Sequence, residues 1–169
     1  MQTFLEESLQ NISWPRETIV TNEILDDGKK VLIDVDLPEV EDMPNKTANV
    51  PQRGFKLTVK DMSPTKVQRL YMEHVHGVGF RIIGEVFSSL PKTQDLVLSA
   101  FTQRPEKATG SIRDDYLYSV CVSRDAWAKI NFSKLEYIDV VDALTQFDLR
   151  RDMTKTGAFK PIEPFTSIP

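Results

Sequence analysis

Five carboxylates fall within eleven residues in the stretch DVDLPEVEDMP, residues 34–44, directly after the apolar run VLI. Side chains of an extended strand alternate between its two faces, so Asp34 and Asp36 should point the same way, opposite to their apolar neighbours. Two carboxylates on one face suit a hard cation such as Mg²⁺, which prefers oxygen ligands. They are equally typical of a solvated sheet face. Asp34 and Asp36 are therefore candidate catalytic or metal-binding residues.

A nuclease of the restriction-endonuclease-like type would need more than this pair. Its acid is followed, on the next strand, by an acid and a lysine two residues apart, which complete the metal site and position the attacking water. The next core strand, DLVLSAFTQ, contains no such pair, although Lys56 or Lys60 could supply a lysine. We interpret residues 34–44 as the solvated exit of a strand that binds no cofactor, and keep a Mg²⁺-dependent nuclease-like enzyme on Asp34 and Asp36 as the alternative.

A second candidate site is a polar stripe on the helix predicted for residues 64–90. His74, Arg81 and Glu85 fall within about 40° of one another around the helix axis. Arg81 and Glu85 are four residues apart and can pair with each other while His74 reaches solvent. Alternatively, the stripe lines a pocket or a partner-binding groove, because buried charge must be paired. His74 and His76 differ by about 200° around the axis and are poorly placed to share a metal.

The third candidate is the basic tail, with Arg150, Arg151 and Lys155 as its binding residues. These cations could lie along the phosphates of DNA. Alternatively, Arg150 and Arg151 directly follow a predicted helix and favour its negative end.

Composition limits the classes of partner. The chain has 169 residues and a net charge of −4, which gives no global attraction to nucleic acid, although a local basic patch remains possible. The single cysteine, Cys121, excludes an internal disulfide framework. No secretion signal or membrane-spanning apolar segment is present, so we expect a cytoplasmic protein without membrane contact.

Periodicity predicts the elements that position these residues. Residues 17–25 and 29–37 read as a β-hairpin with the turn DDG, and residues 38–54 read as a long loop that ends at a short strand, FKLTV. Ser63 and Pro64 are suited to cap and begin a helix that reaches about Leu90. The runs DLVLSAF and YLYSVCVSR predict a second hairpin, SRDAWAKI a helical turn, and EYIDVVDALTQFDL an amphipathic helix before an extended tail.

The predicted fold class is therefore α/β (α+β), with a mainly antiparallel sheet of two hairpins packed on a long central helix and a shorter C-terminal helix. Residues 1–15 are expected to form an N-terminal appendage helix, because Pro15 disfavours helical geometry at Trp14. Residues 16–169 should form a single domain.

The phrases DVDLPEVEDMP, FRIIGEVFSSLP, ATGSIRDDYLYSV and MTKTGAFKPIEPF together resemble a bacterial domain of unknown function. This domain occurs in the C-terminal portion of longer proteins, in some after an Mrr-type restriction-endonuclease-like domain. The resemblance covers the chain from about Glu17 to its end and supplies no catalytic residues. It implies that any chemistry lies in an N-terminal partner domain.

The expected function is that of a non-enzymatic accessory, interaction or regulatory domain, and the resemblance implies a DNA-restriction or defence setting. Its expected partner is another protein or the missing N-terminal domain. Binding to nucleic acid is possible but is not supported by the net charge.

Overall fold

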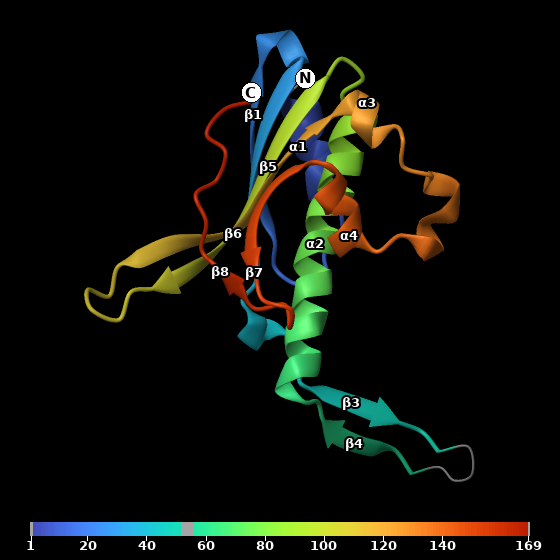
Figure 1. Ribbon diagram of the computed structural model, residues 1–169, viewed down its shortest axis with the longest axis vertical. Coiled ribbons are helices and arrows are strands. Elements are labelled where there is room, and N and C mark those ends of the chain that lie inside the picture. Colours follow the sequence, from blue (N-terminus) through green and yellow to red (C-terminus); the bar gives the residue numbers. More distant parts are fainter. Residues whose placement is uncertain (1, 52–55, 169) are drawn as a thin grey trace.

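The computed structural model describes residues 2–51 and 56–168 and shows a sheet beside one long helix (Figure 1). The helices are α1 (Gln2–Gln10), α2 (Pro64–Ser89), α3 (Arg124–Trp127) and α4 (Val140–Ala143). The strands are β1 (Ile19–Leu25), β2 (Lys30–Asp36), β3 (Lys46–Asn49), β4 (Thr58–Asp61), β5 (Asp95–Pro105), β6 (Ile112–Ser123), β7 (Asp148–Met153) and β8 (Phe159–Lys160). Short 3-10 turns, η1 (Asp26–Gly28), η2 (Val40–Asp42), η3 (Phe132–Tyr137) and η4 (Leu144–Gln146), join some of them.

The main sheet has the strand order β1-β2-β5-β6-β7-β8, and β2 and β5 form its parallel pair. The other neighbours are antiparallel. The two predicted hairpins are β1–β2 and β5–β6, and α2 provides the crossover that two parallel neighbours require. The predicted fold class is confirmed.

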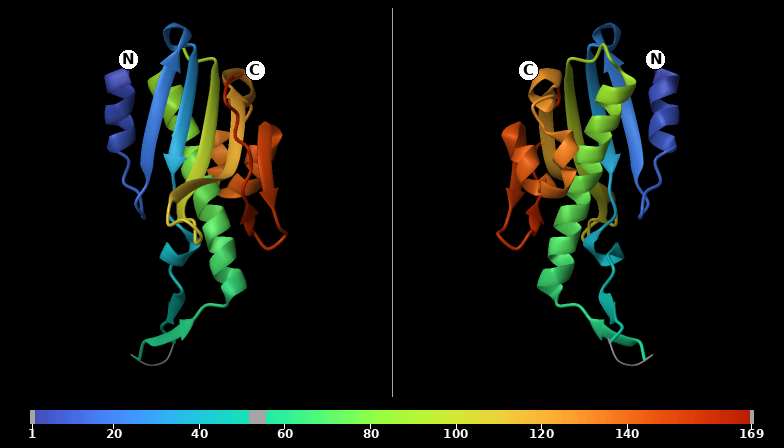
Figure 2. Two further views of the ribbon diagram at one scale, coloured as in Figure 1. Left: turned by 90° about the vertical axis from the view of Figure 1, so that its left-hand side faces the viewer. Right: turned by 90° about the vertical axis from the view of Figure 1, so that its right-hand side faces the viewer.

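All the described helices that contact the sheet lie on one of its faces (Figure 2). The buried side chains of α2 pack against Val31, Ile33 and Val35, which alternate toward this face. Leu5 and Leu9 of α1 are buried in the same core, so the predicted appendage helix packs on the body of the domain. We call this side of the sheet the helix face and the other side the open face.

Both ends of α2 are held by side chains. At its start, the Ser63 hydroxyl accepts a hydrogen bond from the Lys66 amide, as the sequence predicts for a capping serine. At its end, the Arg124 guanidinium donates to the carbonyl oxygens of Phe87 and Leu90, at 3.1 and 2.7 Å, and to that of Thr93 at 2.6 Å. Arg124 thus satisfies acceptors that the last turn of a helix leaves without an internal partner.

Two regions differ from the sequence-based expectation. The predicted loop over residues 38–54 contains η2 and β3, and β4 begins at Thr58, while Phe55 of the predicted strand lies outside the described residues. The predicted helix over residues 136–149 is shortened to α4 and its flanking 3-10 turns, since β7 begins at Asp148 and pairs with β6. Pairing with β6 satisfies backbone groups that an unpaired sheet edge would leave without partners.

The last described segment, residues 161–168, runs in extended form across part of the open face. The Ile162 amide donates to the Tyr116 carbonyl, and the Phe165 amide donates to the Ser119 hydroxyl. The predicted extended course of the tail therefore holds for this segment, although the residues before it form β7 and β8.

Candidate functional site

Asp34 and Asp36 both lie on the open face, as strand alternation predicts. Partial burial raises the pKa of both carboxyl groups, and the negative charge of Asp114 on β6 raises it further. Glu17 adds to the shift of the Asp36 pKa. The two aspartates thus belong to a group of acids that repel one another.

Substituting Asp114→Asn is expected to lower the pKa of both Asp34 and Asp36, because it removes a negative charge that disfavours their ionised forms. A carboxyl-detected NMR titration of the two side chains would measure the change. The matched control is Asp125→Asn on α3, which removes one charge elsewhere and should leave both values unchanged. Equal shifts in the two variants would contradict the expected coupling.

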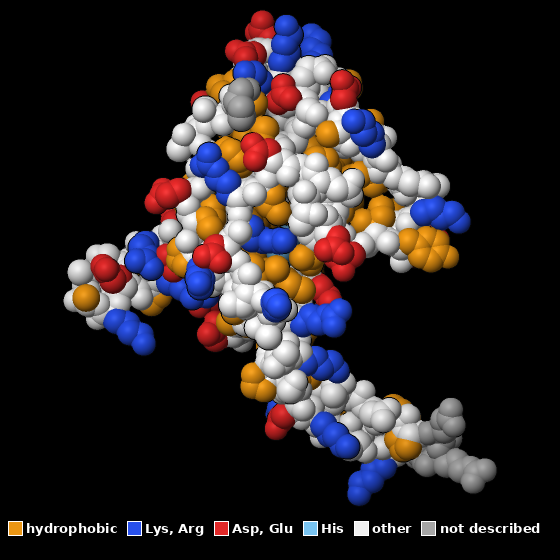
Figure 3. All heavy atoms as spheres, viewed as in Figure 1, with side chains coloured by type: hydrophobic (Ala, Val, Ile, Leu, Met, Phe, Trp, Pro, Cys, Tyr) orange, Lys and Arg blue, Asp and Glu red, His pale blue; other side chains and the backbone are white. Residues whose placement is uncertain are grey.

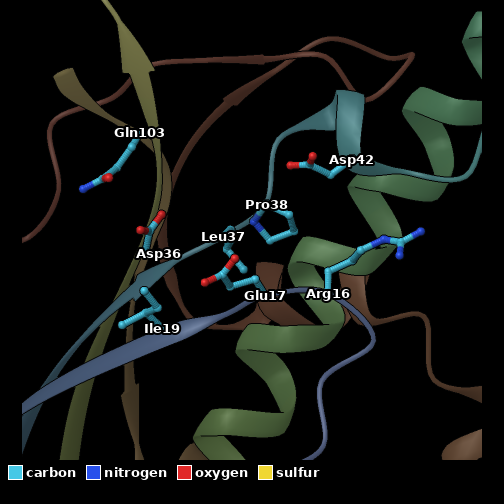
Figure 4. Close-up of a pocket in the computed structure, with 8 residues that line it drawn as sticks. All are labelled: Arg16, Glu17, Ile19, Asp36, Leu37, Pro38, Asp42 and Gln103. Carbon is cyan, nitrogen blue, oxygen red and sulfur yellow. The ribbon is translucent and has the colours of Figure 1, made fainter. Parts of the chain in front are cut away.

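A pocket of about 500 Å³ opens beside Asp36 (Figure 4). Glu17 and Asp42 contribute further carboxylates to its lining, and Gln103 contributes an amide. The side chain of Arg16 also lines the pocket but is directed away from Asp36. The surroundings of Asp36 therefore favour positive over negative charge.

The structure separates Glu85 from the other two residues of the predicted helical stripe. Glu85 faces α1 and accepts hydrogen bonds from the hydroxyl of Ser8 on α1 and from that of Ser89 on its own helix. The guanidinium of Arg81 lies 5.4 Å from the ring centre of Trp14, within cation–π range. Arg81 and Glu85 form no ion pair among those of the described residues, in contrast to one of the two readings of the sequence.

His74 lines two shallow pockets, of about 220 and 390 Å³, next to Pro15. Its pKa is lowered by burial and by the nearby charge of Arg16. Its Nε2 atom is buried without a hydrogen-bond partner among the described residues. Of the stripe, His74 and Arg81 thus share the smaller pocket, whereas Glu85 is used to join two helices.

Arg150 and Arg151 point to opposite faces of the sheet, because both lie within β7 and not after a helix. Arg150 lies on the open face, with its guanidinium 3.9 Å from the ring centre of Phe165 and a hydrogen bond to the Pro164 carbonyl. Both interactions hold the C-terminal segment. Lys155 is exposed in the turn before β8.

Arg151 instead reaches the helix face and contacts His76, a residue that sequence reasoning did not select for binding. The Arg151 Nη1 atom lies 2.8 Å from His76 Nε2, and His76 Nδ1 lies 2.7 Å from the Met72 carbonyl oxygen. A neutral imidazole protonated on Nδ1 satisfies both contacts, since arginine only donates. The ring is fully buried and stacks on Tyr118, with ring centres 5.0 Å apart.

The strands β3 and β4 form a separate antiparallel ribbon, which extends away from the main sheet in Figures 1 and 2. All eight of its strand residues are exposed. The Met62 amide donates to the Asn45 carbonyl at 2.7 Å, so the two ends of the ribbon meet at its base. Lys60 lies in β4 and Lys56 precedes it, so the lysines of the alternative nuclease reading lie on the ribbon and not beside Asp34.

Within the described residues, no three His, Cys, Asp or Glu side chains are grouped so that they could hold a metal ion. None of the described helices combines the length and the apolar character needed to cross a membrane. The chain matches no protein-family model, and neither curated proteins nor solved structures gave a match.

Proposed function

We propose that this chain is a non-enzymatic interaction domain, in which an α/β body presents the β3–β4 ribbon to a partner. The observation that carries the proposal is the full exposure of the ribbon strands. An isolated two-stranded hairpin is marginally stable in water, so a projecting ribbon gains most from contacts with another molecule. The resemblance to a domain that accompanies other domains in longer proteins agrees with this role.

The positions of the predicted site residues in the fold also support an interaction role over catalysis. Glu85 lies between α1 and α2, Asp34 and Asp36 lie on the open face, and the lysines lie on the ribbon. The side chains of an active site must converge within hydrogen-bonding reach of one reacting group. These residues are instead dispersed over three parts of the molecule.

The alternative is a metal-dependent nuclease built on Asp34 and Asp36. One observation favours it, since the two carboxylates share a face with Asp114 and have a raised pKa that a bound cation would lower. Its test is a calorimetric titration with Mg²⁺ or Mn²⁺, in which the heat of binding must disappear in the Asp34→Ala variant.

A photoreactive benzophenone side chain placed on the ribbon is expected to form covalent adducts with a partner in living cells. Thr58 and Val59 are suitable positions, because neighbouring residues of a strand face opposite ways. The control position is Glu23, which is equally exposed on β1. Gel shifts, followed by nuclease or protease digestion, would reveal the adducts and their class. Absence of adducts from both ribbon positions, or the same adducts at Glu23, would refute the proposal.

A further inference from the structure

The two faces of the β3–β4 ribbon differ in chemistry. Strand pairing aligns Thr47 with Lys60 and Asn49 with Thr58, so these four polar side chains share one face. Lys56 stands two residues before Thr58, the spacing that returns a side chain to the same face. This polar face contains no acid among its described residues. The opposite face carries the exposed aliphatic residues Ala48 and Val59 together with the paired Lys46 and Asp61, and the exposed Val50 and Leu57 adjoin the strand ends.

The composition of the polar face matches that of protein surfaces that contact the nucleic-acid backbone. Lysine, threonine and asparagine side chains are among the usual donors to phosphate oxygens. A hollow of about 400 Å³ lies along the ribbon, lined by Thr47, Ala48, Asn49, Pro51, Thr58 and Lys60. The polar face thus offers a concave surface of hydrogen-bond donors together with positive charge.

Positive charge is concentrated in the ribbon and the residues that adjoin it. Residues 44–70 contain six Lys or Arg and one acid, Asp61, although the whole chain has a net charge of −4. Figure 3 shows Lys and Arg side chains along the ribbon and over the adjoining end of α2. Among the ion pairs of the described residues, none involves Lys46, Lys56 or Lys60. Lys56 and Lys60 therefore remain available to an anionic partner, whereas Lys46 lies across from Asp61 on the opposite face.

We infer that the polar face of the ribbon binds the phosphate backbone of double-stranded DNA, an inference that rests on the proposed interaction function. The major groove of DNA admits a two-stranded β-ribbon, whereas the deep and narrow major groove of duplex RNA does not admit side chains readily. Binding through backbone phosphates is independent of base sequence and releases counterions, so it weakens as salt rises. Lys56 and Lys60 supply the charge, and Thr47, Asn49 and Thr58 supply the neutral hydrogen bonds.

The test is fluorescence anisotropy of a labelled DNA duplex titrated with the full chain over a series of salt concentrations. We expect the double substitution Lys56→Gln and Lys60→Gln to weaken binding by at least about tenfold near 0.1 M salt and to reduce the slope of log affinity against log salt by about 2. The matched control, Lys92→Gln with Lys129→Gln, removes the same charge from exposed positions outside the ribbon and should change neither quantity much.

The possible results separate this inference from the proposed function. Absence of DNA binding by the unmodified chain, an equal loss in both double variants, or binding that does not depend on salt would overturn DNA as the partner. If photoadducts at Val59 then contained protein, the interaction function would stand with a protein bound on the aliphatic face. DNA adducts at Thr58, together with the expected loss of affinity, would support both.

Discussion

The substitution Gly79→Ala is expected to lower the free energy of unfolding by about 2–4 kcal/mol. A Cβ atom at this position would lie 2.1 Å from the Tyr118 hydroxyl oxygen, far inside van der Waals contact. That hydroxyl is buried and donates a hydrogen bond to the Val75 carbonyl at 2.9 Å. The methyl group must therefore displace the ring and break this bond, and the loss exceeds the gain of about 1 kcal/mol that alanine brings to a helix.

Chemical denaturation of Gly77→Ala provides the matched control. The same substitution two residues earlier meets no atom within 4 Å, so it should stabilise the protein by about 0.5–1 kcal/mol. Adding Tyr118→Phe to Gly79→Ala should recover part of the loss, because it removes the atom that clashes. Similar effects of the two glycine substitutions would show that the approach of Tyr118 to α2 is not this close.

Stability is expected to fall by about 2–3 kcal/mol between pH 7 and pH 4.5 because of His76 alone. Burial, assisted by the nearby charge of Arg151, outweighs the hydrogen bond to Met72 and the charge of Asp139, and the net effect lowers the pKa of His76 from 6.5 to about 4. Below pH 6.5 the imidazole of His76 therefore becomes protonated in the unfolded chain, whereas in the folded protein it stays neutral until about pH 4. The contribution of His76 is fully present above pH 6.5 and is lost as the pH falls through this window.

Denaturation curves of the wild type and of His76→Gln, measured at several pH values, would isolate this contribution, because both proteins keep all the carboxylates. The His74→Gln variant removes the half-buried histidine and should keep most of the pH dependence. The NMR signal of His76 in the folded wild type gives an independent measure and should not titrate between about pH 5.5 and 7.5. Titration near pH 6.5 would contradict the burial of a neutral ring.

Local signals in the sequence were sufficient for the largest elements. The turn DDG marks the first hairpin because Asp26, Asp27 and Gly28 all adopt positive φ values. Ser63 and Pro64 mark the start of α2, and the alternation around Asp34 assigns its face correctly. Each of these features depends on a few adjacent residues, so a single sequence contains the information.

Features that depend on pairing between distant segments could not be predicted in this way. Strand alternation would place Tyr116 and Tyr118 on one face, but an irregularity between Ala100 and Phe101 changes the register. Tyr118 consequently bonds to α2, while the ring of Tyr116 lies 5.4 Å from that of Phe101. Such an irregularity re-aims side chains and carries no simple local signal.

The strand that contains Arg150 and Arg151 is not predictable from the local sequence for a similar reason. The sequence alone suggests that Arg150 and Arg151 are neighbouring surface cations. The pairing of β7 with β6 places their side chains on opposite faces of the sheet. The spacing of His76 from His74 along α2 does not reveal the role of His76, because its contacts come from Tyr118 on β6 and Arg151 on β7. A buried polar residue within an apolar part of α2 was the signal that could have revealed it, since such a group needs partners.

Because its base is closed by a hydrogen bond, the β3–β4 ribbon is an insertion that can be replaced without altering the rest of the fold. The ribbon is inserted in the connection from β2 to α2, and the hydrogen bond between Met62 and Asn45 brings its two ends together before α2 begins. Hairpins of another length or composition can be grafted at this point with little change in the loop-closure entropy of the body. Exchange of this one hairpin would therefore alter the exposed surface of the ribbon while the core around α2 stays the same.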